Sequence, residues 1–259
     1  MRAIIIAAGQ GTRLRPYTAN VPKCMVPING KTLLERQIDA FRNIGIDDIV
    51  VIRGYLGKAI QYPNVTYVDN VHFKQNNILE SLFCAQKYLV GDVIVSYGDI
   101  VYHPNILLGL AKSNAPSALV VDIDWKKTYE NRTDHPSSEA ELCKIVSVQD
   151  DYIPGPGNHR IIELGKHVSE DEGVAEFIGL AKFSAASIAR LQALYEKALL
   201  KGQDQKYIFA PTLRKAYLTD LLNHAILEEE WMYPYYIKGG WREIDTVQDY
   251  ERAQTEVNW

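Results

Sequence analysis

Cysteines and long apolar segments are both scarce in this sequence. Only three cysteines occur among 259 residues, Cys24, Cys84 and Cys143, and their odd number and wide spacing fit neither a disulfide framework nor a zinc site. No run of about eighteen apolar residues is present, so the sequence predicts no membrane-spanning helix. The apolar run at residues 2–6 is too short for a signal peptide. We therefore expect a protein of the cytoplasm with no membrane partner.

An overall positive charge is absent as well. The formal net charge is −4 and the isoelectric point is near 5.9, which argues against nucleic acid as a partner. Residues 1–36 are the exception, because six lysine or arginine residues occur there with a single acidic residue, Glu35. A local excess of positive charge beside a glycine-rich segment is typical of a polyphosphate-binding site.

The glycine-rich segment follows a short isoleucine-rich run. Residues 2–6 predict a buried strand, and the small residues of Ala7-Ala8-Gly9-Gln10-Gly11 let the backbone approach a ligand closely. A Walker phosphate loop is excluded because no lysine comes directly after Gly11. A dinucleotide-binding fingerprint, and with it an NAD-dependent oxidoreductase, is disfavoured because Leu14 stands where the third glycine belongs. The structural alternative is a glycine turn with scattered surface cations.

Strand-like and helix-like segments alternate along the chain. This alternation predicts an α/β fold with a Rossmann-like, mostly parallel or mixed sheet flanked by helices. The expected strands are 2–6, 48–53, 65–68, 93–97, 117–123, 142–148, 161–164, 175–183 and 232–237. The expected helices are 32–45, 77–89, 105–112, 185–200, 211–216 and 219–229, with a last helix capped by Thr246. Residues 124–160 interrupt the alternation, and we expect them to form an insertion over the carboxyl edge of the sheet within one domain, 1–259.

The N-terminal motif A-A-G-x-G-T-R-L-x-P, with Pro22-Lys23 further on, resembles the signature of the sugar-phosphate nucleotidylyltransferase superfamily. Members of that superfamily transfer a nucleoside monophosphate from an NTP to a phosphorylated acceptor and release pyrophosphate. The resemblance implies that the nucleotide is bound by Ala7, Ala8, Gly9, Gly11, Thr12, Arg13, Asn77, Ser81 and Gly98. Asn77 is also well suited to cap the helix that it precedes.

The same resemblance assigns the chemistry to two cations and two carboxylates. Arg13 and Lys23 match the catalytic cations, with Arg13 on the leaving pyrophosphate and Lys23 between the α-phosphate and the acceptor. Asp99, directly after strand 93–97, and Asp245, in E-I-D-T-x-x-D, match metal ligands and imply a Mg²⁺ cofactor. Alone, Asp99 would be a turn residue and Asp245 a solvated loop acid. No general base is expected, because the acceptor oxygen is already deprotonated at neutral pH.

A second set of motifs is similar to cytidylyltransferases that act on small acceptors such as phosphocholine, phosphonates and phosphoglutamine. These motifs are N-x-x-x-S-L at residues 77–82, V-V-D-x-x-W at 120–125 and E-F-I-G-L-A-K-F-S at 176–184. The resemblance implies that the acceptor is bound by Lys23, Asp122, Trp125, Arg132, Lys166 and Glu176. Structural alternatives are that Trp125 plugs the sheet edge, that Arg132 pairs with Glu130 or Asp134, and that Lys166 is an ordinary exposed lysine.

We therefore expect a Mg²⁺-dependent cytidylyltransferase that transfers CMP from CTP to a small phosphate- or phosphonate-bearing acceptor. Backbone carbonyls of residues 7–9 would accept from the cytosine amino group, and Ser81 would donate to its O2. One alternative is a sugar-1-phosphate nucleotidylyltransferase that uses dTTP, UTP or GTP, and a more remote one is a catalytically silent, nucleotide-binding regulatory homologue. The proline- and glycine-rich run 151–159 matches neither group and leaves the acceptor open, and a homodimer stays open as well.

Overall fold

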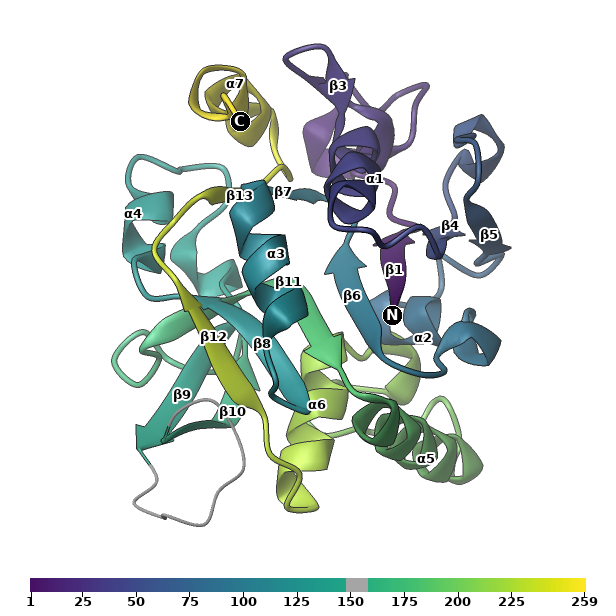
Figure 1. Cartoon of the computed structure of the whole chain (residues 1–259), viewed down its shortest axis with the longest axis vertical. Coiled ribbons are helices and arrows are strands. Elements are labelled where there is room, and N and C mark those ends of the chain that lie inside the picture. Colours follow the sequence, from purple (N-terminus) through teal and green to yellow (C-terminus); the bar gives the residue numbers. More distant parts are fainter. Residues whose placement is uncertain (148–157) are drawn as a thin grey trace.

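A mixed sheet of nine strands runs through the protein (Figure 1). The computed structural model describes residues 1–147 and 158–259, so most of the run 151–159 lies outside the described residues. The strand order is β10-β9-β11-β6-β1-β4-β5, with β8 paired to β11 and β12 paired to β8. The strands are β1 (Arg2–Ala7), β4 (Ile49–Arg53), β5 (Thr66–Asp69), β6 (Val93–Tyr97), β8 (Ser117–Asp122), β9 (Leu142–Ser147), β10 (His159–Gly165), β11 (Ala175–Phe183) and β12 (Tyr233–Ile237).

The sheet has a parallel part that is organised around β1. This strand pairs in parallel with both β4 and β6, and Ala3, Ile4 and Ile5 are fully buried. A continuous apolar run is what a parallel strand requires when helices cover both of its faces. Strand β11 runs antiparallel to β6, β8 and β9 and so joins the parallel part to the rest of the sheet. The α/β fold with a mixed sheet is confirmed.

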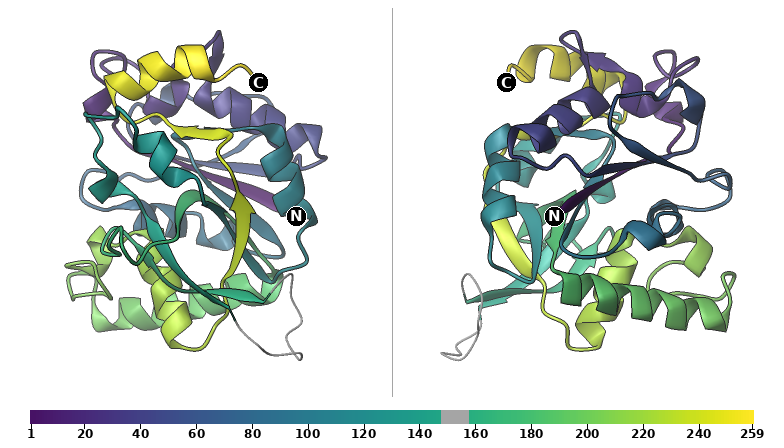
Figure 2. Two further views of the ribbon diagram at one scale, coloured as in Figure 1. Left: turned by 90° about the vertical axis from the view of Figure 1, so that its left-hand side faces the viewer. Right: turned by 45° about the vertical axis from the view of Figure 1, so that its right-hand side comes forward.

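Helices cover both faces of the sheet. Helices α1 (Leu33–Asn43) and α3 (Pro104–Lys112) contribute to one apolar cluster, whereas α2 (Ile78–Phe83), α5 (Ala185–Lys201) and α6 (Leu218–Leu227) contribute to the other. Figures 1 and 2 show α5 and α6 together on the side opposite to α1. Among the described residues, no helix combines the length and the apolar character that a membrane crossing needs.

Two expected helices are shorter than the sequence pattern suggests. Helix α2 begins after its cap at Asn77 but ends at Phe83, and Gln86–Tyr88 forms a separate 3-10 turn. The amide of Cys84 donates to both Glu80 O and Ser81 O, which tightens the last turn and ends the α-helical geometry. The expected helix 211–216 is a 3-10 turn at Leu213–Lys215.

The segment expected as an insertion contributes to the main sheet. It begins with the short helix α4 (Trp125–Tyr129), passes through a loop, and reaches β9. Strand β9 pairs with β11 and β10, all antiparallel, so this segment extends one end of the sheet. The loop between α4 and β9 carries His135, Glu139 and Glu141, which line the cavity described below.

The C-terminal segment packs against the N-terminal part of the chain (Figure 2). Strand β13 (Trp241–Glu243) pairs with β7 (Ile100–Tyr102), and the amide of Ile244 donates to Asp99 O at 2.9 Å. Helix α7 (Val247–Glu256) follows, and it packs beside the short hairpin of β2 (Pro27–Ile28) and β3 (Lys31–Thr32). These contacts bring Asp99 and the residue after Ile244, Asp245, to the glycine-rich loop.

Candidate active site

The glycine-rich loop packs directly on Lys23. Gly11 has φ +61°, and a Cβ added there would lie 2.9 Å from Lys23 Cβ, so both the backbone conformation and the space favour glycine. The hydroxyl of Thr18 donates to Gly11 O at 2.6 Å and fixes the far end of the loop. The two parts of the N-terminal motif therefore lie side by side at the end of β1.

A cavity of about 440 Å³ opens beside this loop. Of the residues expected to bind substrates, those that line it are Ala8, Gly9, Gly11, Thr12, Arg13, Lys23, Asn77, Ser81, Asp99, Lys166, Glu176 and Asp245. Ala7 and Gly98 do not line it. A Cβ on Gly98 would lie 2.7 Å from Ile6 O, and its amide donates to that oxygen at 2.9 Å. Gly98 therefore lets the chain before Asp99 pack tightly against β1.

Lys23 lies at the centre of the charged wall of the cavity. Its Nζ donates to Asp99 Oδ2 at 2.8 Å and to Asp245 Oδ1 at 2.6 Å, and Asp245 also pairs with Arg13. Burial by itself would lower the pKa of Lys23, but the negative charges of Asp99 and Asp245 outweigh it and raise that pKa. Burial would likewise raise the pKa of Asp245, and the charge of Lys23 holds it well below its ordinary value. Both groups are charged at neutral pH.

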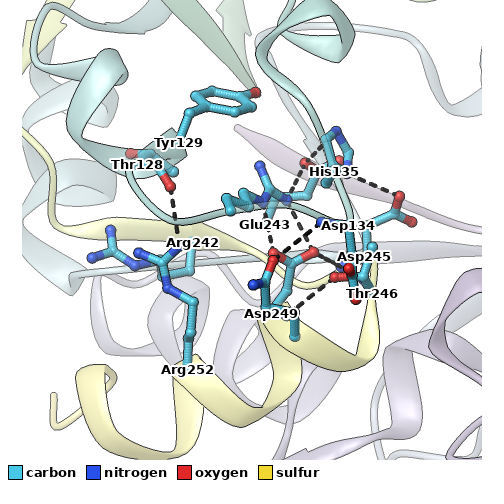
Figure 3. Close-up of polar contacts among 12 residues, drawn as sticks. Thr128, Tyr129, Asp134, His135, Arg242, Glu243, Asp245, Thr246, Asp249 and Arg252 are labelled. Carbon is cyan, nitrogen blue, oxygen red and sulfur yellow. Dashed lines mark hydrogen bonds and ion pairs between the residues drawn. The ribbon is translucent and has the colours of Figure 1, made fainter.

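A third carboxyl group, that of Glu243, completes this wall and was not expected from the sequence. Atoms of His135, Glu243 and Asp245 that could bind a metal lie within 4.8 Å of one another (Figure 3). Burial and the nearby charge of Asp99 raise the pKa of Glu243, as expected where acidic groups crowd together. A sequence signal existed: Glu243 and Asp245 flank Ile244, which is fully buried, so both carboxylates are directed away from the core.

Asp249 holds the chain around Asp245 in place (Figure 3). Its Oδ2 accepts from the amides of Asp245 at 3.1 Å and Thr246 at 2.8 Å, and its own amide donates to Thr246 Oγ1 at 3.1 Å. This reciprocal capping box fixes the start of α7. The position of the Asp245 carboxylate is therefore set by a helix terminus and not by a free loop.

The structure corrects the acceptor contact expected for Arg132. Its guanidinium is buried and does not line the cavity; it donates to both oxygens of Asp249 at 2.6 and 3.0 Å and to Glu243 Oε2 at 3.1 Å. The alternative pairing with Glu130 or Asp134 is wrong as well. Arg132 instead links the loop after α4 to Glu243 and Asp249.

Asp122 and Trp125 also lie outside the cavity lining. Asp122 is fully buried at the end of β8, where it accepts from Trp241 Nε1 at 2.8 Å and from the Gly239 amide at 3.0 Å. Trp125 packs in a small apolar cluster with Ala140, Leu142 and Val168. Because both side chains are buried and neither lines the cavity, the acceptor contacts expected for them do not fit, and the structural alternative for Trp125 does.

Lys166 and Glu176, which the sequence analysis assigns to the acceptor, also line the cavity. Lys166 Nζ lies 2.7 Å from Glu139 Oε2 and 4.9 Å from the centre of the Tyr217 ring. Glu176 Oε1 accepts from the Tyr129 hydroxyl at 2.6 Å. Burial raises the pKa of Glu176 to about 8.

Glu141 and Tyr217 line the cavity too and were missed as site residues. Burial raises the pKa of Glu141 to about 7, and its two oxygens accept from the hydroxyls of Thr219 and Tyr97, each at 3.2 Å. The pair Ala140-Glu141 stands just before a strand that the pattern predicts, so its position at the sheet edge was available from the sequence. The side-chain direction was not, because it depends on the path of the preceding loop.

Asn77 and Ser81 form the wall at the start of α2. Asn77 Oδ1 accepts from the Ile78 amide at 2.9 Å, which confirms the helix cap, and its Nδ2 donates to Lys215 O at 3.1 Å. The Ser81 hydroxyl donates to Asn77 O at 3.1 Å and accepts from Asn70 Nδ2 at 2.9 Å. Both residues reach the cavity with their hydrogen-bonding groups already oriented.

Comparisons with known proteins agree with this geometry. The model of the MobA-like NTP transferase domain matches residues 3–205. The CTP:phosphoglutamine cytidylyltransferase of Campylobacter jejuni is 32% identical over 264 residues, which cover 97% of this chain and 98% of that protein. The choline-phosphate cytidylyltransferase of Streptococcus pneumoniae is 38% identical over 106 residues, which cover 39% of this chain and 46% of that protein.

Solved structures share the fold at lower sequence identity. The CTP:phosphocholine cytidylyltransferase of Streptococcus pneumoniae superposes with a TM-score of 0.70 at 23% identity, over 99% of both chains. The inositol-1-phosphate CTP transferase of T. maritima gives a TM-score of 0.68 at 21% identity, over 97% of this chain and 94% of the other. With the family model matched over most of the chain and one relative aligned almost end to end, the nucleotidyltransferase resemblance of the sequence is confirmed, and the chain belongs to the MobA-like NTP transferase family.

Proposed function

We propose that this protein is a Mg²⁺-dependent cytidylyltransferase that transfers CMP from CTP to a small phosphate- or phosphonate-bearing acceptor. The observation that carries the proposal is that one cavity joins the glycine-rich loop, the Lys23 centre and the wall of Lys166. A nucleoside triphosphate and an anionic acceptor can therefore meet in one place. The near full-length similarity to a phosphoglutamine cytidylyltransferase supports this acceptor class.

In the proposed reaction an acceptor oxygen attacks the α-phosphorus of the nucleotide. A new P–O bond forms, the bond to the β-phosphate breaks, and pyrophosphate leaves with the electron pair. The attacking oxygen is ionised at neutral pH, so the barrier arises from repulsion between two anions, and neutralising that charge is the main task of the protein. Lys23 suits this task because an ammonium has three donors and two are used by Asp99 and Asp245. The third is left for a phosphate oxygen.

Arg13 suits the leaving group. Its side chain is half exposed and pairs with Asp245 at the mouth of the cavity. A guanidinium can bind two phosphate oxygens at once, and it cannot lose its proton as the pyrophosphate departs.

The residues at the Lys23 centre fit a divalent cation. Asp99, Glu243 and Asp245 offer oxygen ligands of the kind Mg²⁺ prefers, and possible ligand atoms of Glu243, Asp245 and His135 lie within 4.8 Å of one another. Burial and the nearby charges of Asp99 and Asp245 raise the pKa of Glu243, and a bound cation would favour its ionised form. When bound, Mg²⁺ would neutralise phosphate oxygens during the transfer. Asp99, Glu243 and Asp245 would hold it.

CTP is the proposed donor because the wall near the base offers acceptors to an amino group. Ala8 lines the cavity and its carbonyl accepts from the Tyr55 amide at 3.2 Å; we assign its second lone pair to the cytosine N4 amino group. Uracil presents a carbonyl at that place, and an unmet buried carbonyl costs about 1–3 kcal/mol. That penalty corresponds to a preference for CTP over UTP of roughly tenfold to a hundredfold.

Pyrophosphate release tests the proposal. The protein is mixed with CTP, Mg²⁺ and a panel of acceptors that includes 2-aminoethylphosphonate, phosphocholine and phosphoglutamine, and CMP-linked products are identified by mass spectrometry. We expect release that needs both CTP and one of these acceptors, that EDTA abolishes, and that Asp99→Asn abolishes. Transfer from dTTP, UTP or GTP to a sugar 1-phosphate, without transfer from CTP, would replace the proposal with a sugar-nucleotide activity. Binding of nucleotide with no release for any pair would indicate a silent homologue.

A further inference from the structure

The acceptor part of the cavity is unexpectedly acidic for an enzyme that handles two anions. Four glutamates line the cavity, Glu139, Glu141, Glu176 and Glu243, and only Glu243 belongs to the Lys23 centre. Glu139 is neutralised by Lys166 at 2.7 Å. Among residues 1–147 and 158–259, Glu141 and Glu176 have no cationic partner within ion-pair distance, and both are more than nine-tenths buried. Either group, once ionised, would repel a phosphate or a phosphonate, so we assign the two groups to another part of the substrate.

One carboxyl oxygen of Glu176 accepts no hydrogen bond from the described residues. Oε1 accepts from the Tyr129 hydroxyl at 2.6 Å, whereas Oε2 is buried and makes no hydrogen bond within the part of the chain that the structure describes. The residue is only 4% exposed, and it lines the cavity. A buried acceptor without a donor destabilises the fold, so its presence at a cavity wall indicates that a ligand supplies the missing donor.

Glu141 offers a second acceptor in the same cavity. Its oxygens accept only from two neutral hydroxyls, those of Tyr97 and Thr219. Each carboxylate oxygen can accept two hydrogen bonds, so this side chain can take another from a ligand. The hydroxyl bonds also fix its orientation, which reduces the entropy lost when a ligand binds.

Two aromatic side chains that line the cavity, Tyr97 and Tyr217, are not free to form a cage for a quaternary ammonium group. Such a group has no N–H and is bound by open aromatic faces. The Tyr217 ring already has the Lys166 ammonium 4.9 Å from its centre. The Tyr97 ring packs edge-on against Phe177 with centroids 6.1 Å apart, and its hydroxyl is held by Glu141. The chemistry that remains is acceptance of hydrogen bonds by carboxyl oxygens.

We propose that Glu176, assisted by Glu141, binds the end of the acceptor remote from its phosphate or phosphonate, and that it selects acceptors that carry N–H donors, a primary ammonium above all, over quaternary ammonium compounds. This inference rests on the proposed function, because it concerns the acceptor of the same cavity. The inference separates two acceptors for which relatives are named. The 2-aminoethylphosphonate cytidylyltransferase of Lancefieldella rimae is named for a primary amine, whereas the choline-phosphate cytidylyltransferase of Streptococcus pneumoniae is named for a quaternary ammonium compound.

An N-methylation series tests the inference without any mutation. The acceptors are 2-aminoethyl phosphate, its N-methyl and N,N-dimethyl derivatives, and phosphocholine, which keep the positive charge while the N–H donors are removed one by one. We expect kcat/KM for the wild-type protein to fall along the series, by about tenfold to a hundredfold from the first member to the last. Equal values, or a preference for phosphocholine, would overturn the inference.

The variant Glu176→Gln assigns the effect to this side chain. The amide keeps an oxygen for the Tyr129 hydroxyl but turns its NH₂ group toward a ligand, so kcat/KM for 2-aminoethyl phosphate should fall about tenfold while that for phosphocholine changes little. Glu172→Gln is the matched control, because Glu172 is exposed, pairs with Lys144 and does not line the cavity. A uniform loss for all four acceptors in Glu176→Gln would show a structural role and overturn the inference.

A binding measurement separates this inference from the proposed function. The acceptors are titrated by calorimetry into the protein with Mg²⁺ and a CTP analogue whose α–β bridge is a methylene group. Tighter binding of 2-aminoethyl phosphate than of phosphocholine supports the inference even if no acceptor turns over. Absence of that preference overturns it even if CMP transfer to some other acceptor is found.

Discussion

The buried Glu176 should make the stability of the protein depend on pH in a way that one substitution removes. In the folded protein burial raises the pKa of Glu176 to about 8 from an ordinary value of 4.5. An unfolded chain exposes the side chain to water, where its pKa returns to about 4.3. The substitution Glu176→Gln keeps the shape of the side chain and an oxygen that can accept from the Tyr129 hydroxyl. The glutamine side chain does not titrate.

The sign and the size of this pH dependence follow from the linkage between proton binding and folding. Between pH 4.5 and 8 the unfolded chain has lost the Glu176 proton and the folded protein has kept it, so the free energy of unfolding falls as the pH rises. The slope approaches about 1.4 kcal/mol per pH unit, and from pH 5 to pH 8 it sums to about 3.5 kcal/mol. The penalty becomes constant about one unit above pH 8, where the folded protein has also lost the proton. Glu176→Gln should therefore gain about 3.5 kcal/mol relative to the wild type when the pH is raised from 5 to 8.

Urea unfolding at pH 5 and pH 8 measures this difference. The other buried acid on this side of the cavity, Glu141, titrates near pH 7 in both proteins and cancels in the comparison. Glu172→Gln serves as the control: its hydrogen bonds to Lys144 and Ser169 lower the pKa of Glu172, so its titration lies below pH 4.5 and should add no slope above pH 5. If the gap between Glu176→Gln and the wild type is the same at both pH values, Glu176 is not held as a buried acid and the reasoning fails.

Other substitutions probe the Lys23 centre and its support. Asp99→Asn and Asp245→Asn should each lower kcat for pyrophosphate release by about a hundredfold or more, with unchanged circular dichroism, because each removes an oxygen ligand; turnover near the wild-type value in both would contradict the metal site. Lys23→Met should abolish turnover and lower the free energy of unfolding by about 3 kcal/mol, since it removes the buried cation shared by Asp99 and Asp245; urea unfolding checks the second part. Arg13→Ala should lower kcat more than it raises KM for the nucleotide and should leave stability within about 0.5 kcal/mol, because its side chain is half exposed. Arg132→Met should cost about 3–5 kcal/mol of stability by stranding its two carboxylate partners, and a melting temperature equal to that of the wild type would exclude the buried ion pairs.

The parts of the site that the sequence predicts are those fixed by backbone geometry. A short apolar strand that ends in small residues must place the glycine-rich loop at the carboxyl edge of a parallel sheet, and Asp99 follows a neighbouring strand to the same edge. Asp245 was assigned through resemblance. Asp245 reaches Asp99 because β13 pairs with β7. This pairing is only three residues long, and it joins segments about 140 positions apart in the chain.

The parts that the sequence could not predict depend on side-chain direction in an irregular segment. Asp122 ends a strand, like Asp99, but it is fully buried and accepts from Gly239 and Trp241 inside the fold. Arg132 lies in a loop, and its carboxylate partners are more than 100 positions away in the chain. Neither periodicity nor capping signals fix such contacts, so residues that support the site from behind were taken for residues that touch the acceptor.

The most direct test of the proposed function is a comparison of kcat/KM for CTP, UTP, dTTP and GTP with one acceptor, 2-aminoethyl phosphate, at saturating Mg²⁺. We expect kcat/KM for CTP to exceed that for UTP by roughly tenfold to a hundredfold, because uracil would leave backbone carbonyls at the loop of Ala8 without a donor. The same four nucleotides are then measured with glucose 1-phosphate as the acceptor. Higher kcat/KM for dTTP or GTP with the sugar phosphate than for CTP with 2-aminoethyl phosphate would contradict the account.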